Sequence, residues 1–211
     1  MTLAELAVAT GFYKSTILRI CESLEKYALV YRMDDGRFKL ANGLVRLGEV
    51  AKRGHDLRRQ IYSVLDTLVS ETGESASFYV PHMGKRLCLC RIDSTKSVRD
   101  HIKEGDLLPV NVGAAGRVLQ RFSKRESASQ IPNRDLVEVS LGERDPEIAS
   151  VAGPAFDANG FIGALSISGP LSRFGKVKIA GFRESVLSAC KRLTQLGGGS
   201  ASLFEVRSAR R

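Results

Sequence analysis

Hydrogen-bond donors gather near the start of the chain, on a segment that the sequence predicts to be helical. An exposed helix with donors at its N-terminal end can reach base edges and phosphates in the major groove of DNA. The donors in this segment are Tyr13, Lys14, Ser15, Thr16 and Arg19.

The elements that would position these donors form a helix, a turn and a second helix. Thr2 and Glu5 have the spacing of a capping box, which marks a helix start. Gly11 tolerates the positive φ of a sharp turn, and a second helix is expected to begin near Tyr13. Its apolar stripe, which should be buried, consists of Ile17, Ile20, Cys21 and Leu24.

A hairpin follows the second helix. Asp34-Asp35-Gly36 lies between the apolar runs LVYRM and RFKL, and Asp-Gly in that setting is a strong hairpin signal. Arg32, Arg37 and Lys39 on this wing could bind phosphates. A helix pair with a hairpin that binds nothing is the alternative.

A second group of residues could hold an anion. Gly113-Ala114-Ala115-Gly116 opens a predicted helix, where free backbone N–H groups favour negative charge. The alternative is that these small residues only let the helix pack closely on a sheet. Ser166 and Ser168 share one face of a predicted strand, where they could bind a carboxylate or simply face water.

The charge and the cysteine content bear on two classes of function, binding to a polyanion and thiol catalysis. The formal net charge of +9 suits a polyanion partner, but residues 1–59 hold 11 Lys/Arg and 7 Asp/Glu, so most of the excess lies elsewhere. Cys88 and Cys90 share a strand face, and neither they nor His82 and His101 form a recognisable catalytic arrangement. We expect reduced thiols, no metal site, no cofactor and no enzyme.

The predicted domains are 1–40 for DNA binding, 41–55 as a linker helix and 56–196 as a second domain. Asp56 and Gly73 are expected to cap that domain's first helix. A last helix is expected at roughly 177–196, before a disordered basic tail at 197–211. With no signal peptide or apolar span, the protein is expected to be cytoplasmic and away from membranes.

Several segments resemble the isocitrate-lyase-regulator (IclR) family of bacterial transcription factors over about residues 2–196. They follow one another in the order LAELAVATGFYKSTILRICESLEKYALV, DDGRFKLANGLVRLG, GAAGRVL, SLGERDPEIASVAGPAFDANG and ALSISGP. The resemblance implies an α+β protein with a winged helix-turn-helix, a linker helix and a GAF-like effector-binding domain containing an antiparallel sheet. It also implies a homodimer or dimer of dimers.

Family positions carried onto this chain place DNA contacts at residues 14–19. The effector cavity matches Gly113, Ala114, Ala115, Ile148, Ser150, Ser166 and Ser168. Two departures stand out: the family's helix before the one starting at Thr2 is missing, and the stretch from Lys124 to Val139 is short. The winged helix-turn-helix is therefore expected to be incomplete.

The expected function is a regulator that binds double-stranded operator DNA and responds to a small effector, an organic acid or aromatic metabolite. A carboxylate is the expected effector chemistry. The alternative is a small-molecule-binding module whose DNA binding is lost or weakened by the truncated winged-helix domain.

Overall fold

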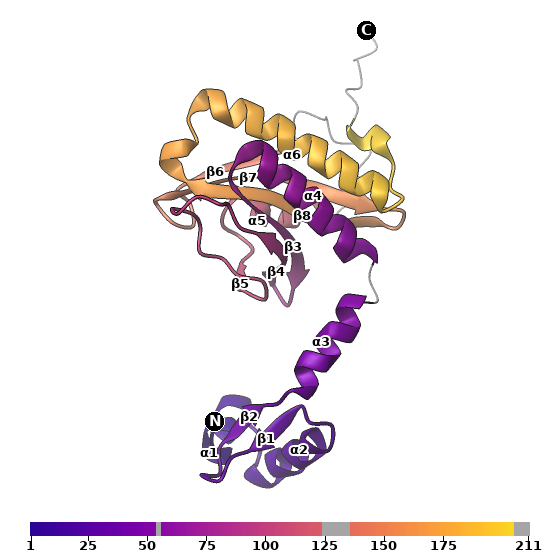
Figure 1. Cartoon of the computed structure of the whole chain (residues 1–211). Coiled ribbons are helices and arrows are strands. Elements are labelled where there is room, and N and C mark those ends of the chain that lie inside the picture. The colour runs from indigo at the N-terminus through magenta and orange to yellow at the C-terminus, as the bar shows by residue number, and fades with distance from the viewer. Residues whose placement is uncertain (54–55, 124–135, 205–211) are drawn as a thin grey trace. The chain divides into compact units, whose positions relative to one another are not determined.

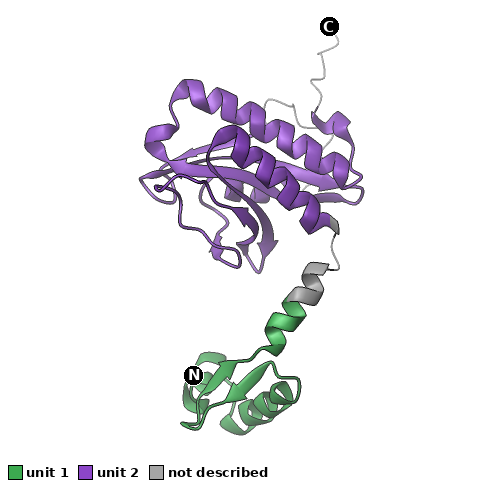
Figure 2. Ribbon diagram, in the orientation of Figure 1, with its two compact units in different colours: residues 1–56 green, residues 57–211 purple. Residues whose placement is uncertain are grey.

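The structure, a computed structural model, describes residues 1–53, 56–123 and 136–204. The chain divides into two compact units, residues 1–56 and 57–211 (Figure 2). Gly54, most of the short stretch from Lys124 to Val139, and the last basic residues of the tail lie outside the described residues, as does the side chain of Asp56.

Unit 1 begins with helices α1 (Leu3–Thr10) and α2 (Lys14–Lys26). The Thr2 N–H donates to Glu5 Oε2 over 2.7 Å, and Thr2 Oγ1 accepts from the Glu5 N–H over 3.2 Å. Both halves of the capping box are thus formed. Gly11 ends α1 at a φ of 73°, which confirms the predicted turn.

The predicted hairpin is also confirmed. Strands β1 (Val30–Arg32) and β2 (Phe38–Leu40) pair antiparallel. Gly36 adopts a φ of 80° in the turn, and its N–H donates to the Met33 carbonyl over 2.9 Å. Helix α3 (Gly43–Arg53) follows the hairpin (Figure 1).

The small core of unit 1 consists of Ile17, Cys21 and Phe38, with Leu3, Leu6 and Leu18 packed against it. The prediction that Ile20 belongs to the buried stripe is wrong, because its side chain is 44% exposed. Phe38 covers the strip of α2 that carries Ile17 and Cys21, while Ile20 lies with half-exposed Phe12 in an apolar groove of about 420 Å³.

Unit 2 is built on a six-stranded antiparallel sheet with the strand order β5-β4-β3-β8-β7-β6. Its strands are β3 (Ser75–His82), β4 (Lys85–Ile92), β5 (Leu107–Pro109), β6 (Glu138–Leu141), β7 (Ile148–Asp157) and β8 (Gly160–Pro170). Its helices are α4 (Asp56–Thr72), α5 (Ala114–Phe122) and α6 (Lys176–Leu196), with short 3-10 turns η3 (Leu171–Arg173) and η4 (Ala201–Phe204).

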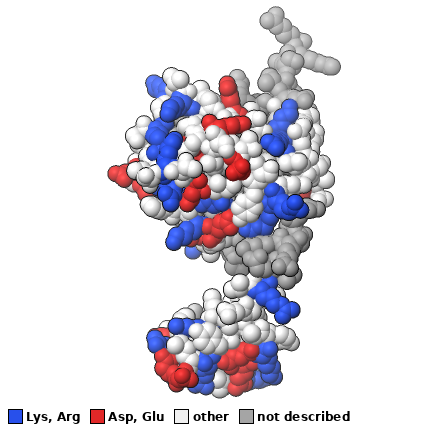
Figure 3. Space-filling view, in the orientation of Figure 1, with Lys and Arg blue, Asp and Glu red and all other residues white. Residues whose placement is uncertain are grey.

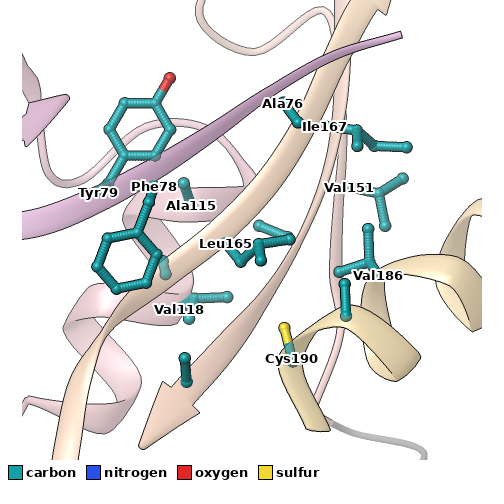
Figure 4. Close-up of a cluster of buried hydrophobic side chains, with 14 of the residues drawn as sticks. Ala76, Phe78, Tyr79, Ala115, Val118, Val151, Leu165, Ile167, Val186 and Cys190 are labelled. Atoms are coloured by element: carbon teal, nitrogen blue, oxygen red, sulfur yellow. The ribbon is translucent and has the colours of Figure 1, made fainter. Parts of the chain in front are cut away.

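The sheet separates two layers of helix. Helices α4 and α6 lie on one face and α5 on the other (Figure 1). Leu165 and Ile167 of β8 pack with Val186 and Cys190 of α6, and all four are fully buried (Figure 4). Because both faces are covered, the central strands are buried on both sides, and side chains facing α5 are enclosed as well.

The chain after α6 differs from the predicted disordered tail. Residues 201–204 form η4, and Phe204 is 5% exposed with its ring centroid 6.3 Å from that of Phe156. The glycine-rich composition of 197–200 and the basic charges that follow favour disorder. The core can nevertheless bury one aromatic side chain from this segment, and that burial orders it.

Candidate functional site

The first candidate surface is the N-terminal end of α2 in unit 1. Tyr13 is the residue before the helix and is 86% exposed. Lys14, Ser15, Thr16 and Arg19 are all exposed as well. Within the described residues, neither Lys14 nor Arg19 has a side-chain hydrogen bond or ion pair, so their charges can contact a ligand.

The wing arginines are more constrained. Arg37 Nε donates to Asp35 Oδ2 over 2.7 Å, and this bond lowers the pKa of the Asp35 carboxyl. The Arg32 guanidinium lies over the Phe38 ring, 5.6 Å from its centroid. Both side chains are exposed, but Asp35 neutralises much of the charge of Arg37. Sequence reasoning did not anticipate that pairing.

The surface charge is mixed. Basic and acidic side chains alternate over the visible face of both units (Figure 3). On the face shown, charge alone therefore does not mark a binding surface, and the geometry of α2 and the wing carries more weight.

The second candidate is a small cavity in unit 2 beneath the start of α5. Six of the seven residues carried over from the family line it: Gly113, Ala115, Ile148, Ser150, Ser166 and Ser168. Ala114 is fully buried and is not in the lining.

Strand register explains why the hydroxyls converge. Ser140 pairs with Ser150, Ser150 pairs with Ser168, and Ser168 pairs with Ser75. Residues directly opposite each other on paired strands point to the same face, so this serine row crosses β6, β7, β8 and β3. Ser166 and Ser168 are 4% and 6% exposed, which excludes the alternative of a sheet face open to water.

The start of α5 differs from the open anion seat that the sequence suggested. The Gly113 N–H donates to Glu143 Oε2 over 3.2 Å, and Glu143 is itself paired with Arg117. This internal carboxylate already occupies the first N–H group. At Gly116 the absence of a side chain lets the helix pack closely against its neighbour, as the alternative interpretation expected. A Cβ there would lie 2.5 Å from the Val110 carbonyl oxygen.

Sequence reasoning missed the charged residues of the cavity, which are Arg86, Asp100 and Arg144. Arg144 Nη2 donates to Asp100 Oδ1 over 2.6 Å. The inward position of Arg86 could have been predicted from the sequence. Alternate residues of a strand point to the same face, so Arg86 lies on the same buried face of β4 as Cys88 and Cys90. Asp100 and Arg144 lie in loops, where no periodic pattern exists.

The four cysteines are free and buried. Burial raises the pKa of Cys88 to about 12 and that of Cys90 to about 11, so neither forms a thiolate near neutral pH. Across residues 1–53, 56–123 and 136–204, no three His, Cys, Asp or Glu side chains gather as a metal site. Over the same residues, no helix has the length and apolar content needed to span a bilayer.

Comparisons with known proteins point to one family, although no family model matches the chain. The transcriptional regulator KipR of Bacillus subtilis is 26% identical over 149 residues, a match that covers 70% of this chain and 60% of KipR. The transcriptional repressor IclR of Escherichia coli is 22% identical, with 94% of this chain and 84% of IclR covered.

A solved structure shares the fold. An IclR transcriptional regulator from Silicibacter sp. TM1040 superposes with a TM-score of 0.81 at 19% identity, covering 95% of this chain and 90% of that one. The relatives are transcriptional regulators, and the α+β fold with its curled antiparallel sheet is the fold of their family. Together, the curated relatives and the solved structure support an IclR-family transcriptional regulator.

Proposed function

We propose that this chain binds operator DNA through unit 1 and that a small organic acid or aromatic metabolite, bound in unit 2, controls that binding. It would act as a homodimer or a dimer of dimers, because two recognition helices about 34 Å apart can enter successive major grooves.

One observation carries the DNA-binding half of the proposal. Lys14, Ser15 and Arg19 extend from the first turns of α2, exposed and without internal partners among the described residues. Phosphate contacts from the wing would add affinity, while base contacts from α2 would add discrimination. Arg32 supports this more strongly than Arg37, whose charge Asp35 offsets.

A binding selection tests this half directly. The full chain is incubated with a pool of random duplexes, bound DNA is amplified, and affinity for the selected site is measured by mobility shift at several salt concentrations. Specific affinity that exceeds non-specific affinity by about 10³-fold or more supports the proposal. Equal affinity for selected and scrambled duplexes contradicts it.

The cavity beneath α5 supports the effector half. It combines buried serine hydroxyls with guanidinium groups, and both bind carboxylates. A thermal-shift series with small carboxylates and aromatic acids measures whether any ligand stabilises the chain; at 100 times its Kd it should contribute about 2.7 kcal/mol.

A second candidate is a small-molecule-binding module with lost or weakened DNA binding. The exposure of Ile20 and Phe12 in the apolar groove of unit 1 favours it, because an incompletely covered helix pair is less rigid. Effector binding without any sequence-selected DNA would distinguish this candidate from the regulator.

A further inference from the structure

Arg86 brings a positive charge into the cavity of unit 2 without an acidic partner of its own. Its side chain is 4% exposed, and its guanidinium lies 5.4 Å from the centroid of the Tyr79 ring. Nη1 donates to the Val112 carbonyl, whereas Nε has no hydrogen-bond partner. No carboxylate among the described residues forms an ion pair with it. A buried donor of this kind costs free energy unless something accepts from it.

Asp100 supplies an unused acceptor in the same cavity. It is also 4% exposed, and its Oδ1 accepts from Arg144 while its Oδ2 has no partner. Two residues that line the cavity thus have unpaired buried atoms, a donor on Arg86 and an acceptor on Asp100. Its lining also holds two guanidinium groups against one carboxylate, which leaves one positive charge without compensation.

The available space limits the size of a ligand. The centre of a water-sized sphere can move through about 20 Å³ of the cavity. One water needs roughly 10–15 Å³ by the same measure, so the closed cavity has room for one or two waters. Only the smallest organic acids can enter with modest movement of the walls, and an aromatic ring requires far more.

We propose that the cavity binds a short-chain aliphatic hydroxy monocarboxylate, with its carboxylate on Arg86 and its hydroxyl donating to Asp100 Oδ2. One negative charge balances the excess positive charge. A second carboxylate would introduce a like charge beside Asp100. An ammonium group could donate to Asp100, but it would make the ligand neutral overall and leave the excess positive charge of the cavity unbalanced. This inference rests on the proposed function of unit 2 and selects one effector class from the broader set.

A matched ligand series tests the proposal on the unmodified full chain. Glycolate, acetate and glycine differ only in the group on the second carbon, which is a hydroxyl, a hydrogen or an ammonium. Titration calorimetry in chloride-free buffer should show glycolate binding at least tenfold tighter than acetate, and also tighter than glycine, whose net charge is zero. Lactate should likewise bind tighter than pyruvate, whose carbonyl cannot donate to Asp100.

Each contrary result has its own meaning. Acetate as tight as glycolate overturns the role of Asp100, and benzoate tighter than glycolate overturns the size argument. With either result, the proposal that unit 2 binds an acid effector would still be supported. If chloride binds and no acid does, the site takes an adventitious ion only, and the effector half of the proposed function fails too; operator binding, measured separately, would be unaffected.

Two variants assign the contacts to residues. Arg86→Gln should weaken glycolate binding at least tenfold, while Arg99→Gln, which alters a half-buried arginine paired with Asp93 outside the cavity lining, should not change it. Asp100→Asn places an amide donor beside the ligand, so the preference for lactate over pyruvate should disappear or reverse. An unchanged preference in Asp100→Asn overturns the proposal even if Arg86→Gln fails to fold.

Discussion

The Gly113 N–H donates to the Glu143 carboxylate at the start of α5, over 3.2 Å. The helix therefore begins against a negative charge supplied by the protein itself. Such a charge near a helix N-terminus is stabilising. It also means that an anionic ligand near α5 must rely on Arg86 and the serine row more than on the Gly113 N–H.

Glu143→Gln should reduce the free energy of unfolding by about 0.3–1 kcal/mol at neutral pH, because the variant keeps an acceptor but loses the charge. The bond from Arg117 lowers the pKa of Glu143, so its contribution is present above the ordinary carboxyl range and is lost as pH falls through the lowered pKa. Urea unfolding at several pH values measures this. The gap between parent and variant should close in acid, and Glu147→Gln, at an exposed site, should show no such gap.

Arg19→Ala should weaken binding to the selected operator by ~1–3 kcal/mol if Arg19 contacts a guanine, and should relax preference at that base. Arg37→Ala is the matched comparison, and it should lose less because Asp35 already offsets that charge. Mobility shifts on a set of point-mutated operators provide the measurement. Unchanged affinity on every operator would remove Arg19 from the contact set.

The double variant Ser166→Ala and Ser168→Ala should lose about 1–3 kcal/mol of binding free energy for the tightest small acid, because its oxygens lose hydroxyl partners. Ser188→Ala on the exposed face of α6 is the control. Calorimetry reports the difference. Equal affinity in a folded double variant would place the ligand elsewhere in unit 2.

Glu74 should anchor unit 2 through a buried ion pair. It is 1% exposed and accepts from Arg173 Nη2 over 2.5 Å and from Lys96 Nζ over 3.0 Å. Glu74→Gln should cost about 1–3 kcal/mol of unfolding free energy. Lys96→Gln removes only the more exposed partner and should cost less than about 1 kcal/mol. Similar losses in the two variants would show that burial of Glu74 does not set the energy.

The local signals in unit 1 and the strands of unit 2 could be predicted from the sequence, since capping boxes, Asp-Gly turns and period-two alternation act over a few residues. The serine row could not be predicted, because it depends on the register of four strands far apart in the chain. The ion pair between Asp100 and Arg144 could not be predicted either, because only the tertiary fold brings these two loop residues together. The exposure of Ile20 could not be predicted either. An apolar stripe on a helix shows which residues can be buried, but the packing of the hairpin against the helix decides which of them are buried.

We propose that a ligand bound in unit 2 and DNA bound at unit 1 change each other's affinity. The most direct measurement is a closed cycle on the full chain: operator affinity with and without saturating glycolate, and glycolate affinity with and without saturating operator. We predict that each ligand shifts the affinity of the other by the same factor, in the range of about 5- to 150-fold. Inserting two glycines near Val50 in α3 should abolish that factor while glycolate still binds. Equal operator affinities with and without glycolate in the parent chain would contradict the account.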